Sequence, residues 1–143
     1  MTHHKLPTAA ESIRKSIKEL IPETATSPSH LVEDQGSISH ETKNGNKTYR
    51  GELLAEKVSL LTEQLRIAGN LQIGRDWRWH LVHFSEDTKL ENARKSGYLV
   101  ILSNNITLTP GGILEERFYT YITNEPVLSA GATVIFIVPP PLG

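Results

Sequence analysis

The chain has 143 residues, of which 38% are hydrophobic, and its 15 basic and 16 acidic residues leave a formal net charge of −1. This length fits one domain with a short appendage. Because the chain contains no cysteine, disulfide frameworks, thiolate metal sites and cysteine nucleophiles are excluded. The near-zero charge argues against a protein whose whole surface holds nucleic acid.

The start of the chain lacks the features of a targeting segment. Residues 1–7 include two histidines and one lysine, and no apolar stretch follows them as it would in a secretory signal. No apolar run reaches the roughly 18 residues of a membrane span. We therefore expect a soluble, cytoplasmic protein with no membrane contact, although export by another route stays open.

Residues 1–22 predict an N-terminal amphipathic helix. Thr8 and Glu11 match a capping box, and Pro22 ends the segment. The apolar residues recur at helical spacing at Ile13, Ile17, Leu20 and Ile21. Because a helix this short is marginal alone in water, its stripe must pack on the chain's own core or dock in a partner's groove.

Residues 23–48 predict a polar linker, because their few apolar residues follow neither the helical nor the strand period. Residues 43–47, Lys-Asn-Gly-Asn-Lys, have the composition of a turn. We expect this turn to close the linker; the alternative is that it joins two short strands.

The folded domain is expected over residues 49–143. Its first element is a helix, in which Leu54, Val58, Leu61 and Leu65 form a stripe at intervals of four, three and four residues. The apolar side chains at Leu53, Leu60 and Ile67 should widen this stripe. Such a wide stripe favours packing on a sheet or between other helices.

Residues 76–84 alternate as a strand, with Trp77, Trp79, Leu81 and His83 on one face. A short helix should follow from Ser85 and stop at Gly97. Residues 98–102 form a continuous apolar run, which is typical of a strand buried on both faces.

Residues 104–105, Asn-Asn, are expected to form a hairpin turn into a strand at 106–109, and residues 110–112 turn the chain again. A long strand is predicted over 113–123, and the last strand over 132–138. The three prolines at 139–141 end that strand and also have the composition of an extended recognition tail.

These elements predict an α+β fold. Its helices lie toward the N-terminus and pack on a mainly antiparallel sheet of four to five strands. The predicted organisation is therefore the helix at 1–22, the linker at 23–48 and the α+β domain at 49–143.

No cofactor or metal site is predicted. The chain has no phosphate-binding glycine loop and no dinucleotide fingerprint. His80 and His83 are three residues apart, so a strand places them on opposite faces and they cannot share one ion. Each remains a candidate general base, because the ordinary histidine pKa lies near neutrality.

The best clue to function is the aromatic content of two strand faces. Trp77 and Trp79 share a face with His83, and Arg117, Tyr119 and Tyr121 share another. If these faces are open, they offer stacking surfaces with cationic neighbours, which is typical of binding surfaces. We therefore expect a non-enzymatic module that binds a protein partner or a small ligand, and not nucleic acid.

An alternative is a small toxin-like or effector-like enzyme. Arg50, Ser103 and Glu125 are similar in order to the arginine, serine and glutamate of some ADP-ribosyltransferases. This resemblance implies that Arg50 and Ser103 hold NAD and that Glu125 assists the transfer. Two asparagines follow Ser103, and Thr123 stands where that family has a second acidic or amide residue.

A ribonuclease-like enzyme is the other version of this alternative. Here His80 would be the base, Arg78 a phosphate clamp and Glu116 their partner. RNA binding usually needs a positive surface, which a net charge of −1 does not favour. The residues of the enzyme hypothesis as a whole are Arg50, His80, Ser103 and Glu125.

Overall fold

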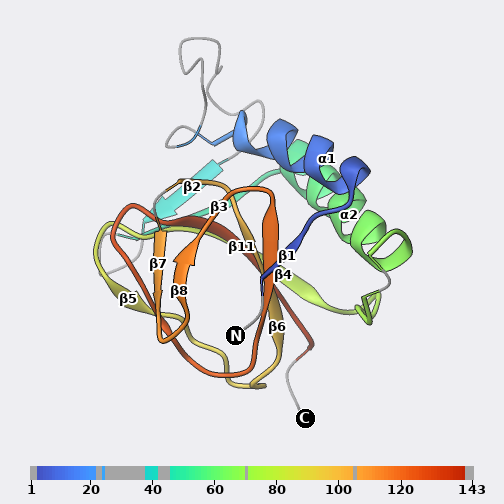
Figure 1. The fold of residues 1–143 in the computed structure, drawn as a ribbon. Coiled ribbons are helices and arrows are strands. Elements are labelled where there is room, and N and C mark those ends of the chain that lie inside the picture. Colours follow the sequence, from blue (N-terminus) through green and yellow to red (C-terminus); the bar gives the residue numbers. More distant parts are fainter. Residues whose placement is uncertain are drawn as a thin grey trace.

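The computed structural model describes residues 3–21, 24, 38–41, 46–69, 71–104 and 106–140. They form three layers, in which two helices cover one face of a seven-stranded sheet and a four-stranded sheet packs on its other face. Figure 1 shows the two helices side by side on one side of the strands. The predicted α+β class is confirmed, but the strands outnumber the four to five expected because they form two sheets.

The seven-stranded sheet is antiparallel at every recorded pairing, with β11 at its centre. Its strands, in spatial order, are β1 (His3–Lys5), β9 (Phe118–Ile122), β6 (Gly97–Ile101), β11 (Thr133–Val138), β4 (Arg78–His83), β3 (Lys47–Arg50) and β2 (Ile38–Glu41). The predicted strands at 76–84, 98–102 and 132–138 are thus confirmed to within two residues at each end.

The four-stranded sheet is also antiparallel. Its strands, in spatial order, are β5 (Thr88–Lys89), β10 (Val127–Leu128), β7 (Ile106–Thr109) and β8 (Gly112–Leu114). A turn at 110–112 joins β7 to β8, as expected, and Gly111 and Gly112 both have positive φ angles there.

The central strand β11 explains why two cores exist. Val134 and Phe136 face the four-stranded sheet, whereas Ile135 and Ile137 face the helices. All four side chains are at most 3% exposed. Strands that are covered on both faces are continuously apolar, which is the pattern the sequence shows here.

Helix α2 (Glu52–Ile67) buries the stripe that the sequence predicts, with Leu54, Val58, Leu61 and Leu65 fully buried. The expected widening of the stripe is wrong. The side chains of Leu53, Leu60 and Ile67, which were expected to widen it, are 38%, 52% and 66% exposed, respectively. The helix therefore lies on the sheet along one narrow face.

Helix α1 (Thr8–Lys18) confirms a helix within residues 1–22, but His3–Lys5 of that range form the strand β1. Its N-cap is Pro7, and no side chain caps it. Glu11 instead accepts hydrogen bonds from Arg14, so its carboxylate is not free to complete a capping box. The helix packs against α2, and Ala10 and Ile17 enter the same core as the α2 stripe.

Two strands lie where the sequence suggests a linker. β2 and β3 pair with each other, and β3 continues into the seven-stranded sheet by pairing with β4. Paired strands therefore precede and follow residues 42–45, as in the alternative that two short strands are joined there, and the expectation that this segment closes a linker is wrong. Most of the expected linker, at 25–37 and 42–45, lies outside the described residues.

The long strand predicted over 113–123 is wrong. It is divided into β8 and β9, which belong to different sheets. Arg117, directly before β9, has a φ of 78°, a left-handed conformation that cannot continue a strand. The chain therefore crosses between the sheets at residues 115–117.

The short helix predicted after Ser85 is also wrong, because β5 and turns occupy that stretch. The buried side chain of Asn92 explains the turns: it donates to the carbonyls of Ile122 and Asn124 and accepts from the backbone N–H of Ser96. Such side chain–backbone bonds compete with helix formation.

The hairpin expected at 104–105 is not formed. β6 pairs with β9 and β11, whereas β7 pairs with β8 and β10 in the other sheet. Asn105 itself lies outside the described residues. Neither described helix is long and apolar enough to cross a membrane.

Candidate binding surface

The strand register gathers the aromatic side chains on one face of the seven-stranded sheet. Trp79 lies opposite Ile137, Ile137 opposite Tyr98, and Tyr98 opposite Tyr121. Residues directly opposite each other in a sheet share a face. The two aromatic faces that the sequence separates are therefore one surface, on the side of the sheet that the helices cover.

We use the name aromatic surface for the side chains of Trp77, Trp79, Tyr98, Tyr119 and Tyr121. Ring contacts join most of it into a row. The ring centroids of Trp77 and Tyr98 are 6.1 Å apart, and those of Tyr98 are 5.0 Å from Tyr121 and 6.2 Å from Tyr119. These distances are typical of favourable aromatic pairs, so each ring helps to fix its neighbour.

The aromatic surface lies at the margin of the helix-side core. Trp77, Trp79 and Tyr98 are half-buried and pack against this core, Tyr119 is 8% exposed, and Tyr121 is 41% exposed. Tryptophan and tyrosine suit such a boundary, because each has an apolar ring and a polar group that needs a partner or water. The surface thus presents ring faces together with hydrogen-bonding groups.

Two tyrosines of this surface, Tyr98 and Tyr119, have raised pKa values. Burial raises the pKa of Tyr119, and burial together with the neighbouring tyrosines raises the pKa of Tyr98. The Tyr121 hydroxyl shares a 2.9 Å hydrogen bond with the Ser96 hydroxyl. Because protonated phenols both donate and accept, they can bind polypeptide carbonyls as well as N–H groups.

A groove of about 360 Å³ continues the aromatic surface toward α2, and Trp77 and Trp79 form part of its wall. Arg66 of α2 holds the opposite wall in place, donating to the Ile73 carbonyl at 2.6 Å and pairing with Glu63. Arg75, which also lines the groove, is exposed and forms no hydrogen bond or ion pair with the described residues.

Gly74 allows Trp77 to occupy its position. A Cβ on Gly74 would lie 2.8 Å from an indole carbon of Trp77, which is closer than real Cβ contacts. The backbone N–H of Trp77 also donates to the Gly74 carbonyl at 3.2 Å, which closes the turn. The position of this indole is therefore set by the backbone as well as by its aromatic neighbours.

Two residues predicted for the site lie away from this row. His83 is on the same sheet face but at the far end of β4 from Trp79, where its Nδ1 forms a 2.7 Å hydrogen bond with the Thr133 hydroxyl. Arg117 lies before β9 and is 3.8 Å from the Glu11 carboxylate.

Tyr98 is the member of the surface that the sequence reasoning missed. It begins the apolar run at 98–102, and this run predicts a strand buried on both faces, so the pattern does not single out Tyr98. A signal was available, because Tyr98 stands at the end of that run, next to the polar Ser96 and Gly97. Ends of buried strands are where amphipathic rings reach solvent.

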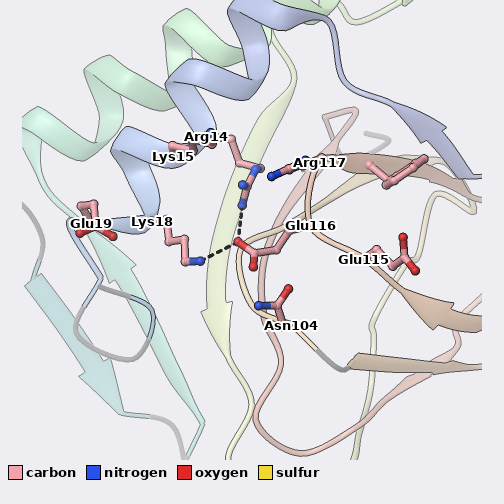
Figure 2. Close-up of a pocket in the computed structure, with 9 residues that line it drawn as sticks. Arg14, Lys15, Lys18, Glu19, Asn104, Glu115, Glu116 and Arg117 are labelled. Atoms are coloured by element: carbon pink, nitrogen blue, oxygen red, sulfur yellow. Dashed lines mark hydrogen bonds and ion pairs between the residues drawn. The ribbon is translucent and has the colours of Figure 1, made fainter. Parts of the chain in front are cut away.

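A second hollow lies between α1 and the crossing at residues 115–117, with a volume of about 780 Å³. Figure 2 shows Arg14 and Lys18 pointing from α1 toward Glu116. Nη1 of Arg14 and Nζ of Lys18 are each 2.8 Å from Oε1 of Glu116. Arg14 is only 2% exposed, and it also donates to the Ile101 carbonyl of β6 at 3.2 Å.

Arg14 and Lys18 compensate the charge of Glu116 in this hollow. Burial alone would raise the pKa of Glu116, but the hydrogen bonds and charges of Lys18 and Arg14 outweigh it and hold the pKa below its ordinary value. Burial likewise opposes the charge of Arg14, but Glu11 and Glu116 raise its pKa overall. Because Arg14 pairs with Glu116 and also donates to the Ile101 carbonyl, this cluster ties α1 to the sheet.

The residues of the enzyme hypothesis lie on different elements. Arg50 is on β3, whereas Ser103 follows β6, three strands away in the sheet or about 14 Å. The Ser103 hydroxyl accepts from the Thr133 N–H at 2.9 Å. Glu125, before β10, accepts from the Asn92 N–H at 3.0 Å.

The two histidine-based roles are also spread out. Partial burial and the charge of Arg78 hold the pKa of His80 below its ordinary value. Glu116 is bound to α1, and β9, which follows it, is three strands from β4. Within the described part of the chain, no hydrogen bond joins any two of Arg50, His80, Ser103 and Glu125, and no three histidine or acidic side chains gather as metal ligands.

Comparison with known proteins finds no family model, no curated protein and no solved structure that matches this chain. The interpretation of function therefore depends on the geometry of the chain itself.

Proposed function

We propose that this protein is a binding module that holds a polypeptide partner on its aromatic surface. The observation that carries the proposal is the group of amphipathic rings on one sheet face, with Tyr121 41% exposed at its end. Tryptophan, tyrosine and arginine are the residues most enriched at the energetic centres of protein interfaces. The half-buried rings are fixed by their neighbours, so little conformational entropy is lost when a partner binds.

A selection from a random peptide library displayed on phage tests this proposal. We expect enriched peptides to bind the full chain, and their affinity to fall at least about tenfold, or about 1.4 kcal/mol, in Tyr121→Ala and Trp79→Ala. Ile113→Ala is the matched control, because Ile113 is a 69% exposed apolar residue on the other sheet.

Two results would count against the proposal. One is that no peptide is enriched on the full chain. The other is that the enriched peptides bind both aromatic variants as tightly as the original protein, since the contact would then lie elsewhere. Thermal unfolding of each variant separates loss of binding from loss of the fold.

A further inference from the structure

We infer that the solvent-facing side of α2 is a second interaction surface, which binds an amphipathic helix of a partner protein with basic residues beside its apolar row. We use the name α2 ridge for the side chains of Leu53, Leu60 and Ile67, which form this side of the helix. The aromatic surface lies on strands of the seven-stranded sheet and the segment before β4, so this inference goes beyond the proposed function and does not depend on it.

The α2 ridge gathers exposed apolar side chains on one element. In the described part of the chain, six large hydrophobic side chains are exposed, and three of them belong to the ridge. The other three lie on three different strands, at Ile113, Tyr121 and Val127. Single exposed apolar residues are ordinary on protein surfaces, whereas a group on one side of one helix is typical of an interaction surface.

The spacing of the ridge favours a helix as its occupant. Its residues are seven apart, which is close to two helical turns, so they form a line about 21 Å long on α2. A second helix that crosses α2 at about 20° can contact all three, because its own side chains recur at the same interval. An extended strand covers the about 10.5 Å between neighbours in about three residues, so its successive contacts would point in opposite directions.

Acidic side chains accompany the ridge along one side. The period of the helix places Glu52, Glu56 and Glu63 on the same side of the line. Lys57 falls on the opposite side, where it donates to the Ser16 hydroxyl of α1 at 2.6 Å. The acidic side therefore faces away from α1, and it is the side along which a partner helix would present its own charges.

Two of these three carboxylates are not compensated within the described part of the chain. Glu63 pairs with Arg66, whereas Glu52 and Glu56 form no hydrogen bond or ion pair with a described residue. Because Glu52 and Glu56 are four residues apart on the helix, their charges repel each other. A basic side chain of the partner beside Leu53 and Leu60 would relieve this repulsion. Charges that flank an apolar row in this way set the choice and orientation of paired helices.

The same charges argue against two other occupants. If two copies of this chain paired antiparallel about Leu60, the acidic sides of their α2 helices would face each other; in a parallel pair, the basic side chain beside the row, Lys57, already donates to Ser16. A membrane surface is also disfavoured. Helices that lie on membranes carry basic side chains beside their apolar face, because the lipid surface is anionic.

Fluorescently labelled helical peptides of about three heptads test the inference by polarisation titration of the full chain. The first peptide is alanine-based, with leucine at every seventh residue and lysine on both sides of the leucine row. The second has glutamate in place of each lysine. The third has the composition of the first, but its leucines are five residues apart and do not share a face. We expect the first to bind at least about tenfold more tightly than either of the others.

Variants locate the contact. Leu60→Ala should weaken binding of the first peptide at least about tenfold, whereas Ile113→Ala, at an exposed apolar residue of the other sheet, should leave it unchanged. Changing both Glu52→Lys and Glu56→Lys should reverse the preference between the lysine and glutamate peptides. Glu86→Lys is the control for charge, because Glu86 is exposed and lies outside α2. Unfolding curves of the same variants establish that the fold is kept.

Several results would overturn the inference. The first peptide failing to bind is one, and its binding no more tightly than the third is another. A third is binding that Leu60→Ala does not weaken. If sedimentation of the full chain shows a dimer that Leu60→Ala dissociates, a second copy occupies the ridge and the inference is wrong.

The outcomes also separate the α2 ridge from the aromatic surface. Tyr121→Ala should bind the first peptide as tightly as the original protein does, and a loss would place the contact on the aromatic surface instead. Conversely, peptides from the phage selection that need Tyr121 should bind Leu60→Ala normally. Either surface can therefore fail its test while the other stands.

Discussion

The two faces of the seven-stranded sheet are closed in different ways. Toward the four-stranded sheet, Leu99, Ile101, Val134 and Phe136 are at most 3% exposed. Toward the helices, the centre of the sheet is equally buried, but its margin carries rings that are only partly covered. Adjacent residues of β6 show the contrast. Leu99 is in the core between the two sheets, whereas Tyr98 is half-buried beside the core under the helices. Aliphatic side chains occur where coverage is complete, and amphipathic rings occur where it ends.

Leu99→Ala should have the largest effect on stability. It removes a fully buried side chain between two sheets, where the surroundings relax only partly, so we expect a loss of about 3 kcal/mol in the free energy of unfolding. Urea denaturation followed by circular dichroism measures it. A loss below about 1 kcal/mol would mean that the sheet-to-sheet core is not closely packed.

Arg14→Met should cost a similar or slightly smaller amount, about 3 kcal/mol. Arg14 is 2% exposed, and its removal leaves the carboxylate of Glu11 and the carbonyl of Ile101 without their donor. Lys15→Met is the control, because Lys15 is exposed on the same helix. Equal stability of the two variants in urea would show that α1 does not depend on the buried ion pair.

The Glu116 carboxylate should make stability depend on acid pH. Because its pKa is lower in the folded chain than its ordinary 4.5, its contribution is fully present above that value and is lost as the pH falls through the lower, folded value. Urea midpoints measured from pH 6 downward should fall less steeply in Glu116→Gln than in the original protein. Identical slopes would place the acid-sensitive group elsewhere.

Tyr121→Ala should have the smallest effect on stability, at most about 1 kcal/mol, because the side chain is 41% exposed and loses mainly its ring contact with Tyr98. The same change is expected to weaken partner binding strongly. A stability loss as large as that of Leu99→Ala would indicate that the aromatic margin is part of the core and not a binding surface.

Sequence reasoning found the elements whose burial is regular. The α2 stripe and the alternating strand β4 each expose one face, and such one-sided burial leaves a period in the sequence. The same reasoning missed the division at Arg117, because a single left-handed residue between two β-rich stretches leaves no periodic signal. It gave β2 and β3 only as an alternative to a linker, since strands this short among polar residues do not show a period.

The candidate site was only partly accessible to the sequence. Alternation placed Trp77 and Trp79 on one face, and Tyr119 and Tyr121 on one face. That the two pairs share a single surface depends on which strands lie between them, and this is a property of topology. Alternation along strands also predicts His83 and Arg117 for these faces, but His83 lies at the far end of β4 and Arg117 precedes β9.

The central position of β11 has a consequence for how the chain folds. It follows every other strand in the sequence, yet it alone connects the half of the sheet that contains β4 with the half that contains β6. Before Thr133 is available, neither half can bury its inner edge, so both present unpaired backbone groups. Folding should therefore be slow and concerted, because its decisive contacts are distant in sequence.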